Sequence, residues 1–186
     1  MVSEVNLSDT PKITVGLSWE PNEKVRDASS GLVSDIPHDL DLMCCLFSDG
    51  LNLIDMITPQ EPKRDIYAQQ IFHEGDHTSG GSDFEDEALH ILFKNLDPDI
   101  KYIAIVVRMN EGLKISSATD AKCDFLNYSD LESLLSYDLS VAKGSFYLSG
   151  IIKKNHLGDW VLLNISDDLL SANAPDIQNK LRERLS

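Results

Sequence analysis

Acidic side chains are concentrated in residues 74–87, which have the sequence E-G-D-H-T-S-G-G-S-D-F-E-D-E. This segment holds six acidic side chains, three glycines and no basic residue. Calcium takes about six to eight oxygen ligands in proteins, and glycine lets a loop bend tightly enough to aim them. In the register of an EF-hand loop, Asp76 and Glu87 take the first and last ligand positions, but Gly80 replaces an acid. The segment predicts a calcium loop outside an EF-hand, with a solvated acidic loop as the alternative.

A second acidic pair lies in Asp39-Leu40-Asp41-Leu42. Side chains two residues apart on a strand share a face, so Asp39 and Asp41 point to the same side, opposite the two leucines. Like charges at that spacing repel each other unless water or a cation lies between them. The pair is a candidate cation site, and a strand with a wet outer face is the alternative.

Residues 73–77, H-E-G-D-H, match the H-E-x-x-H pattern of zinc proteases. That pattern requires a helix, which puts both histidines on one face and leaves the glutamate as general base. Gly75 disfavours a helix, and the Gly- and Ser-rich residues that follow do not continue one. We therefore expect no enzyme, and we keep a zinc-dependent hydrolase using His73, Glu74 and His77 only as an alternative.

The net negative charge of the chain argues against some kinds of binding partner. The 186 residues carry a net charge of −15, and residues 27–93 hold fourteen acidic and two basic side chains. Such acidity argues against nucleic-acid binding and against docking on anionic lipid. No apolar run is long enough to span a bilayer, the N-terminal residues do not resemble a signal peptide, and three cysteines fit a reducing compartment. We expect a cytoplasmic protein without direct membrane insertion.

The elements that must position these side chains are mostly strands. Residues 12–19 alternate, with Ile13, Val15, Leu17 and Trp19 on one face. Residues 39–47 begin as an alternation and end as an apolar run, and residues 100–108 have the strongest strand pattern. Other strands are predicted at 51–57, 67–72, 121–126, 134–139, 145–153 and 160–165, with loops at 20–37 and 73–86. This spacing predicts an all-β fold, an antiparallel β-sandwich.

The last residues have a different pattern. Ile177, Leu181 and Leu185 lie four apart with charged residues between them, and Pro175 suits a first helical turn. We expect one sandwich domain over residues 1–170 and a C-terminal amphipathic helix within residues 171–186 that packs on it.

Four blocks together resemble the TerD family of tellurium-resistance and general-stress proteins. Val15-Gly16-Leu17-Ser18-Trp19-Glu20 is similar to its opening strand, which ends in Gly-x-x-Trp-Asp, and Asp39-Leu40-Asp41-Leu42 to its Asp-Leu-Asp strand. Gly75-Asp76-His77, Ser79-Gly80, Asp83 and Glu85-Asp86-Glu87 are similar to its Gly-Asp-Asn…Thr-Gly…Asp-Asp-Glu loop, which is the most specific block. Residues 96–107 resemble its Leu…Ile-x-x-Ile-x-Phe-x-Val strand, so the likeness runs over residues 5–165.

The resemblance implies a β-sandwich that binds one or two calcium ions, acts in tellurite or other chemical stress together with stress-response proteins, and has no known catalysis. The implied ligands are Asp76, Asp83, Asp86 and Glu87, then Asp39 and Asp41, then Glu85 and Glu20. The chain departs from the family pattern at several of these positions. His77 replaces Asn, Phe84 replaces Gly, Glu20 and Glu85 replace Asp, and residues 57–70 lack paired asparagines. A metal-free interaction module of the same fold is therefore a further alternative.

Overall fold

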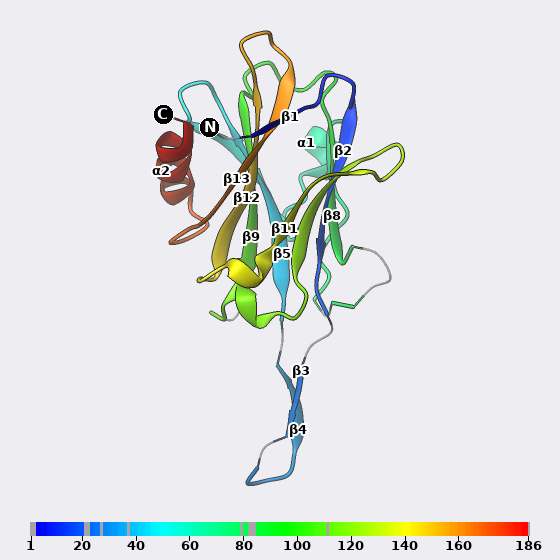
Figure 1. The fold of residues 1–186 in the computed structure, drawn as a ribbon, viewed down its shortest axis with the longest axis vertical. Helices are drawn as coiled ribbons and strands as arrows, with labels where there is room; N and C mark the ends of the chain where they lie inside the picture. The colour runs from blue at the N-terminus through cyan, green and yellow to red at the C-terminus, as the bar shows by residue number, and fades with distance from the viewer. Residues whose placement is uncertain are drawn as a thin grey trace.

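The computed structural model describes residues 3–20, 23–26, 28–36, 38–78, 80–81, 85–110 and 112–185. Two antiparallel sheets face each other, and a helix lies against the outside of the larger one (Figure 1). This confirms the predicted all-β sandwich.

The larger sheet has six strands in the order β1-β13-β12-β9-β5-β6. Its strands are β1 (Glu4–Asn6), β5 (Leu40–Phe47), β6 (Leu53–Ile57), β9 (Tyr102–Met109), β12 (Phe146–Lys154) and β13 (Trp160–Asp168). Strand β5 lies in register with β9, so that Asp41 is opposite Arg108. This pairing brings a carboxylate and a guanidinium from distant parts of the chain side by side.

The smaller sheet has five strands in the order β11-β10-β2-β8-β7. Its strands are β2 (Lys12–Ser18), β7 (Ile71–His73), β8 (Glu87–Leu92), β10 (Lys122–Asn127) and β11 (Ser133–Asp138). The short helical turns are α1 (Arg64–Tyr67), η1 (Ile115–Ser117) and η2 (Leu139–Val141). Part of the strand predicted at residues 67–72 is therefore incorrect, because α1 ends at Tyr67 and β7 begins only at Ile71.

Two apolar cores hold the layers together. The first lies between the sheets and contains Val15 of β2, Leu42 of β5 and Phe125 of β10, all fully buried. The second lies between the larger sheet and α2 (Ala174–Leu185). All eight residues of β5 are buried because its two faces belong to different cores. This explains why its sequence ends as an apolar run instead of alternating.

A two-stranded hairpin projects from one end of the sandwich, between β2 and β5 (Figure 1). It consists of β3 (Glu23–Arg26) and β4 (Val33–Ile36), which pair only with each other in the part of the chain that the structure describes. The sequence predicted a loop over residues 20–37, and for residues 23–26 and 33–36 that prediction is wrong. A ribbon that joins neither sheet needs no alternation of buried and exposed residues, so the pattern used to find strands is missing.

The C-terminal helix forms where its sequence predicted. Ile177 and Leu181 of α2 are fully buried against the larger sheet. Lys180 and Arg184 on the same helix bind the Asp167 carboxylate of β13, with Lys180 Nζ 3.1 Å from Oδ2. Among the described residues, no helix has the length and apolar character that crossing a membrane requires.

Candidate metal centre

Among the described residues, no strand lies beside the first half of β5 on one side, because β6 pairs with residues 44–47 of β5. Two side chains of the smaller sheet bind the backbone there instead. The N–H of Leu42 donates to Oε2 of Glu87 at 2.7 Å, and the Leu42 carbonyl accepts from Nε2 of His73 at 2.9 Å. These bonds fix the start of β5 against the ends of the loop at residues 74–86.

Three carboxylates meet at this place. Asp39 and Asp41 come from the start of β5, and Asp76 comes from the loop that follows β7. Each can offer one oxygen within 4.8 Å of the others, with Asp41 fully buried, Asp39 half-buried and Asp76 exposed. We call Asp39, Asp41 and Asp76 the aspartate cluster.

The cluster is only partly neutralised by its neighbours. Asp41 accepts from Nε of Arg108 at 2.8 Å and from Nε2 of Gln60 at 2.9 Å. Oδ2 of Asp39 accepts from Nδ2 of Asn110 at 2.6 Å, while its buried Oδ1 has no hydrogen-bond partner in the described part of the chain. Burial, with the nearby Asp41 and Asp76 charges, raises the pKa of Asp39 against the opposing Asn110 bond.

Glu87 lies directly behind the cluster with an exposed fraction of 1%. Burial raises its pKa to about 9, and the charges of Asp41 and Asp76 act in the same direction. The backbone N–H groups of Leu42 and His77 oppose the rise only in part. Glu87 is therefore protonated at neutral pH in the metal-free protein, and a cation beside it would favour loss of that proton.

The H-E-x-x-H pattern does not form the helix that its zinc chemistry requires. His73 ends β7, and Glu74 and His77 lie in the loop. The Nε2–H of His73 donates to Leu42, and its Nδ1 accepts from the N–H of Gly75 at 3.1 Å. Burial also lowers the pKa of His73. Its two nitrogens are thus committed to the backbone, and the arrangement of a zinc protease is absent from residues 73–77.

The far end of the acidic loop is attached to β2. The N–H of Asp86 donates to the Leu17 carbonyl, and Oδ2 of Asp86 accepts from the N–H of Trp19, both at 2.8 Å. Gly80 has φ +64°, and a Cβ there would lie 2.5 Å from the Trp19 ring. A Cβ at Gly16 would lie 2.1 Å from Cγ of Glu85. Gly80 therefore leaves room for the Trp19 ring, and Gly16 leaves room for the Glu85 side chain, so that the acidic loop packs closely against the end of β2.

Six of the eight predicted ligands fall into two groups. Asp39, Asp41 and Asp76 come together, with Glu87 beside them. Glu20 and Asp86 instead line a separate pocket of about 360 Å³. Glu85 packs under Gly16, and Asp83 lies outside the described residues.

Sequence reasoning missed four polar residues at these places, which are Gln60, Arg108, Asn110 and Asp120. Arg108 had a usable signal, because it is a basic residue that directly follows the apolar run of residues 103–107. Gln60, Asn110 and Asp120 lie outside the strands, where no periodicity marks a side chain that points into a site.

Comparisons with known proteins agree with this architecture. The TerD domain family model matches residues 3–160. Tellurium resistance protein TerX of Serratia marcescens is 23% identical over 125 residues, in an alignment that covers 59% of this chain and 59% of that protein. The chain therefore spans less than two thirds of this relative's length.

Two solved structures share the fold. A homologue of the telluride resistance protein TerD from Streptomyces coelicolor has a TM-score of 0.69 at 15% identity, over 85% of this chain and 89% of that one. A protein described as of unknown function has a TM-score of 0.72 at 14% identity, over 89% and 94% of the two chains.

Proposed function

The chain belongs to the TerD family of tellurium-resistance proteins, and from this premise we propose that it is a calcium-binding, non-catalytic module of a chemical-stress response. In this proposal it acts in the cytoplasm together with other stress-response proteins. Tellurite is one such stress, since the curated relative is named for tellurium resistance. The net charge of −15 disfavours nucleic acid as a partner.

The observation that carries the calcium proposal is the buried Oδ1 of Asp39. It has no hydrogen-bond partner among the described residues, although it lies next to two further carboxylates. A buried acceptor without a partner costs about 1–3 kcal/mol. A cation would supply the missing interaction for Asp39 and relieve the repulsion within the cluster.

The ligand atoms favour a hard cation. The aspartate cluster offers only carboxylate oxygens, and Glu87 beside it adds another carboxyl group. Oxygen ligands suit calcium and magnesium, whereas zinc prefers histidine and cysteine. Calcium tolerates irregular geometry better than magnesium, which requires a tight octahedron. A cluster assembled from a strand and a loop therefore favours calcium.

The test is a calcium titration of metal-stripped protein, followed by thermal unfolding and calorimetry. At about 100 times its dissociation constant, calcium should stabilise the fold by about 2.7 kcal/mol, and magnesium should do so less. The variant Asp39→Asn/Asp76→Asn should lose most of this shift. Asp9→Asn/Asp99→Asn is the matched control, because it removes the same charge from two exposed positions.

The outcomes separate the alternatives. A calcium shift that survives Asp39→Asn/Asp76→Asn would place the ion elsewhere, with the pocket beside Glu20 and Asp86 as the next site to test. No calcium shift in the unaltered protein would favour a metal-free interaction module.

A further inference from the structure

An open groove of about 740 Å³ lies on the outer face of the larger sheet, beside the start of α2. Met43 of β5, Met56 of β6 and Phe146 of β12 give it an apolar floor. Its volume falls within the range of about 300–1,000 Å³ that is usual for small-molecule sites. Apolar surface of this kind, next to a few polar groups, suits a ligand with an apolar body.

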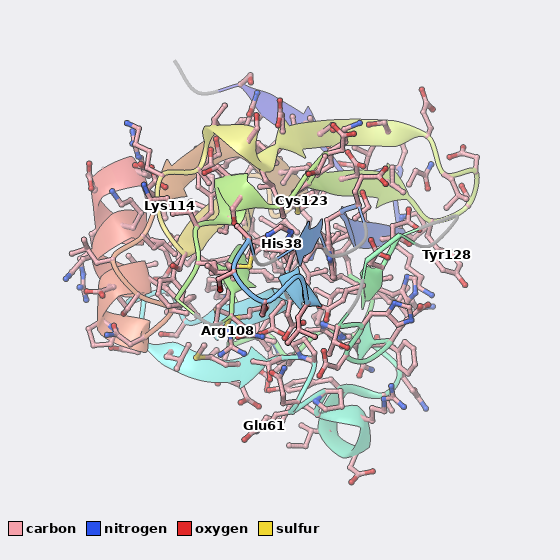
Figure 2. All side chains as sticks on the ribbon, turned by 90° about the horizontal axis from the view of Figure 1, so that it is seen from below. His38, Glu61, Arg108, Lys114, Cys123 and Tyr128 are labelled. Atoms are coloured by element: carbon pink, nitrogen blue, oxygen red, sulfur yellow. The ribbon has the colours of Figure 1, made fainter. Side chains whose placement is uncertain are left out.

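A cationic side chain, Arg108, lines the groove, and it gives an anionic group on that ligand a place to bind. Arg108 is the basic residue among the described lining residues, and Glu61 is the acidic one. Glu61 is largely exposed and already paired with Lys63 at 3.1 Å. Arg108 donates to Asp41 and Gln60 through Nε and Nη2. In the described part of the chain, no hydrogen bond uses its Nη1, so part of the guanidinium remains available to a carboxylate. Figure 2 labels Arg108 and Glu61 in a view from below.

We propose that this groove binds an amphipathic carboxylate, with its apolar body on Met43, Met56 and Phe146 and its carboxylate on Arg108. Nη1 of Arg108 can donate a charge-assisted hydrogen bond to this carboxylate, which is stronger than a bond between neutral groups. A neutral ligand of the same shape would leave this charge-assisted pairing unused.

The groove and the aspartate cluster share one ion pair, which couples them. Arg108 and Asp41 are paired, and Asp41 is fully buried. A calcium ion that took oxygens of Asp41 would weaken the Asp41–Arg108 pair and would leave more of the Arg108 guanidinium to the ligand carboxylate. Coupling between two sites is reciprocal, so the carboxylate should also tighten calcium binding by the same factor. This coupling rests on the proposed function, whereas the groove itself does not.

The experiment uses methionine methyl signals in the full chain. Met43 and Met56 line the groove, and Met109 lies in the core between the sheets as an internal reference. The protein is labelled with ¹³C-methyl methionine and titrated with 4-phenylbutyrate, with and without calcium, and with the neutral 4-phenylbutyramide. The carboxylate should shift Met43 and Met56 saturably but not Met109. The amide should bind about tenfold more weakly, and calcium should tighten carboxylate binding by about fivefold or more.

Two variants test the charge in the groove. Arg108→Met should equalise the affinities for the carboxylate and the amide. Because this change leaves buried Asp41 without its cation, the variant can fail to fold. Met56→Glu therefore places a like charge in the groove without touching Asp41, and it should abolish carboxylate binding. The neutral isostere Met56→Gln is its matched control and should retain carboxylate binding.

Several outcomes would overturn the proposal. They are unshifted Met43 and Met56 signals at millimolar probe, equal affinity for acid and amide, or unchanged carboxylate binding in Met56→Glu. If calcium binds but leaves the probe affinity unchanged, the coupling is wrong. If calcium does not bind at all, the proposed function fails, and the shifts measured without calcium still decide whether the groove binds carboxylates.

Discussion

Glu87 illustrates how a single carboxyl group can serve two states of the molecule. Without metal it is buried and protonated, since burial raises its pKa to about 9, and its Oε2 still accepts from the Leu42 N–H. With a cation beside it, the ionised form becomes favourable. Calcium binding at this place would thus release a proton, which links metal affinity to pH.

The same pKa predicts how the stability of the metal-free protein depends on pH. Between the usual glutamate pKa of 4.5 and about 9, the folded state keeps a proton on Glu87 that the unfolded state has lost. This contribution to stability is fully present below the usual pKa and is lost as the pH rises, by up to about 1.4 kcal/mol per pH unit. In chelator, denaturant unfolding from pH 6 to 8.5 should show a flatter pH dependence in Glu87→Gln than in the unaltered protein.

Glu132→Gln is the control for this comparison, because Glu132 is exposed in the turn between β10 and β11. Glu132→Gln should leave the pH dependence of the free energy of unfolding unchanged. Equal slopes for Glu87→Gln and the unaltered protein would show that Glu87 is ionised in the fold at neutral pH.

Gly80 provides a second test at a single residue. An alanine there must adopt φ +64° and also place its Cβ 2.5 Å from the Trp19 ring and 2.8 Å from the Glu20 carbonyl oxygen. Gly112 has a similar φ of +69°, but its Cβ would meet no atom of the described residues within 4 Å. Gly112→Ala should lower the free energy of unfolding by about 1–2 kcal/mol through backbone strain alone. Gly80→Ala should lower it by a further 1–3 kcal/mol or so through overpacking. Equal losses in denaturant titrations would show that the Trp19 contact does not matter.

The aspartate cluster could be predicted from sequence only in part. Alternation places Asp39 and Asp41 on one strand face, and both the spacing of the acidic loop and the family resemblance indicate Asp76. The pairing of Asp41 with Arg108 could not be predicted, because it depends on the register between β5 and β9. A shift of one residue in that register would turn the two side chains to opposite faces.

At the scale of whole elements, the strands of the two sheets could be predicted better than the segments between them. Strands β2 and β9 cover most of their predicted ranges, because alternating or continuous burial marks them in the sequence. The β3–β4 hairpin was missed, since it pairs only with itself. Strand β1 was missed because three residues at a sheet edge are too few to show a period.

Helix α2 is expected to contribute to global stability rather than to act as a detachable tail. Leu181 is fully buried in the second core. Leu181→Ala should lower the free energy of unfolding by about 2–5 kcal/mol, through lost burial and the cavity left behind. Arg182→Ala, at an exposed position on the same helix, should stay within about 0.5 kcal/mol of the unaltered protein. A small effect of Leu181→Ala in denaturant unfolding would mean that α2 detaches before the sandwich unfolds.

At the scale of the whole molecule, the candidate metal site lies near the end from which the hairpin projects, and the apolar cores run along the sheets. The aspartate cluster lies where β5 begins, directly after the projecting hairpin, and Glu20 directly precedes that hairpin (Figure 1). The two cores lie on either side of the larger sheet. The aspartate cluster and the groove both lie at or near the larger sheet, which packs against an apolar core on each of its faces.

The closure of the β5 edge at Leu42 has a consequence for how copies of the chain meet in solution. A strand edge with free N–H and C=O groups is a template on which another chain can add a strand, and this is a common start of aggregation. Glu87 and His73 occupy both backbone groups of Leu42. These two side chains therefore block the addition of another strand at Leu42. A chain that lost both hydrogen bonds would expose the backbone at the start of β5, and it would be more prone to self-association while most of its fold remained intact.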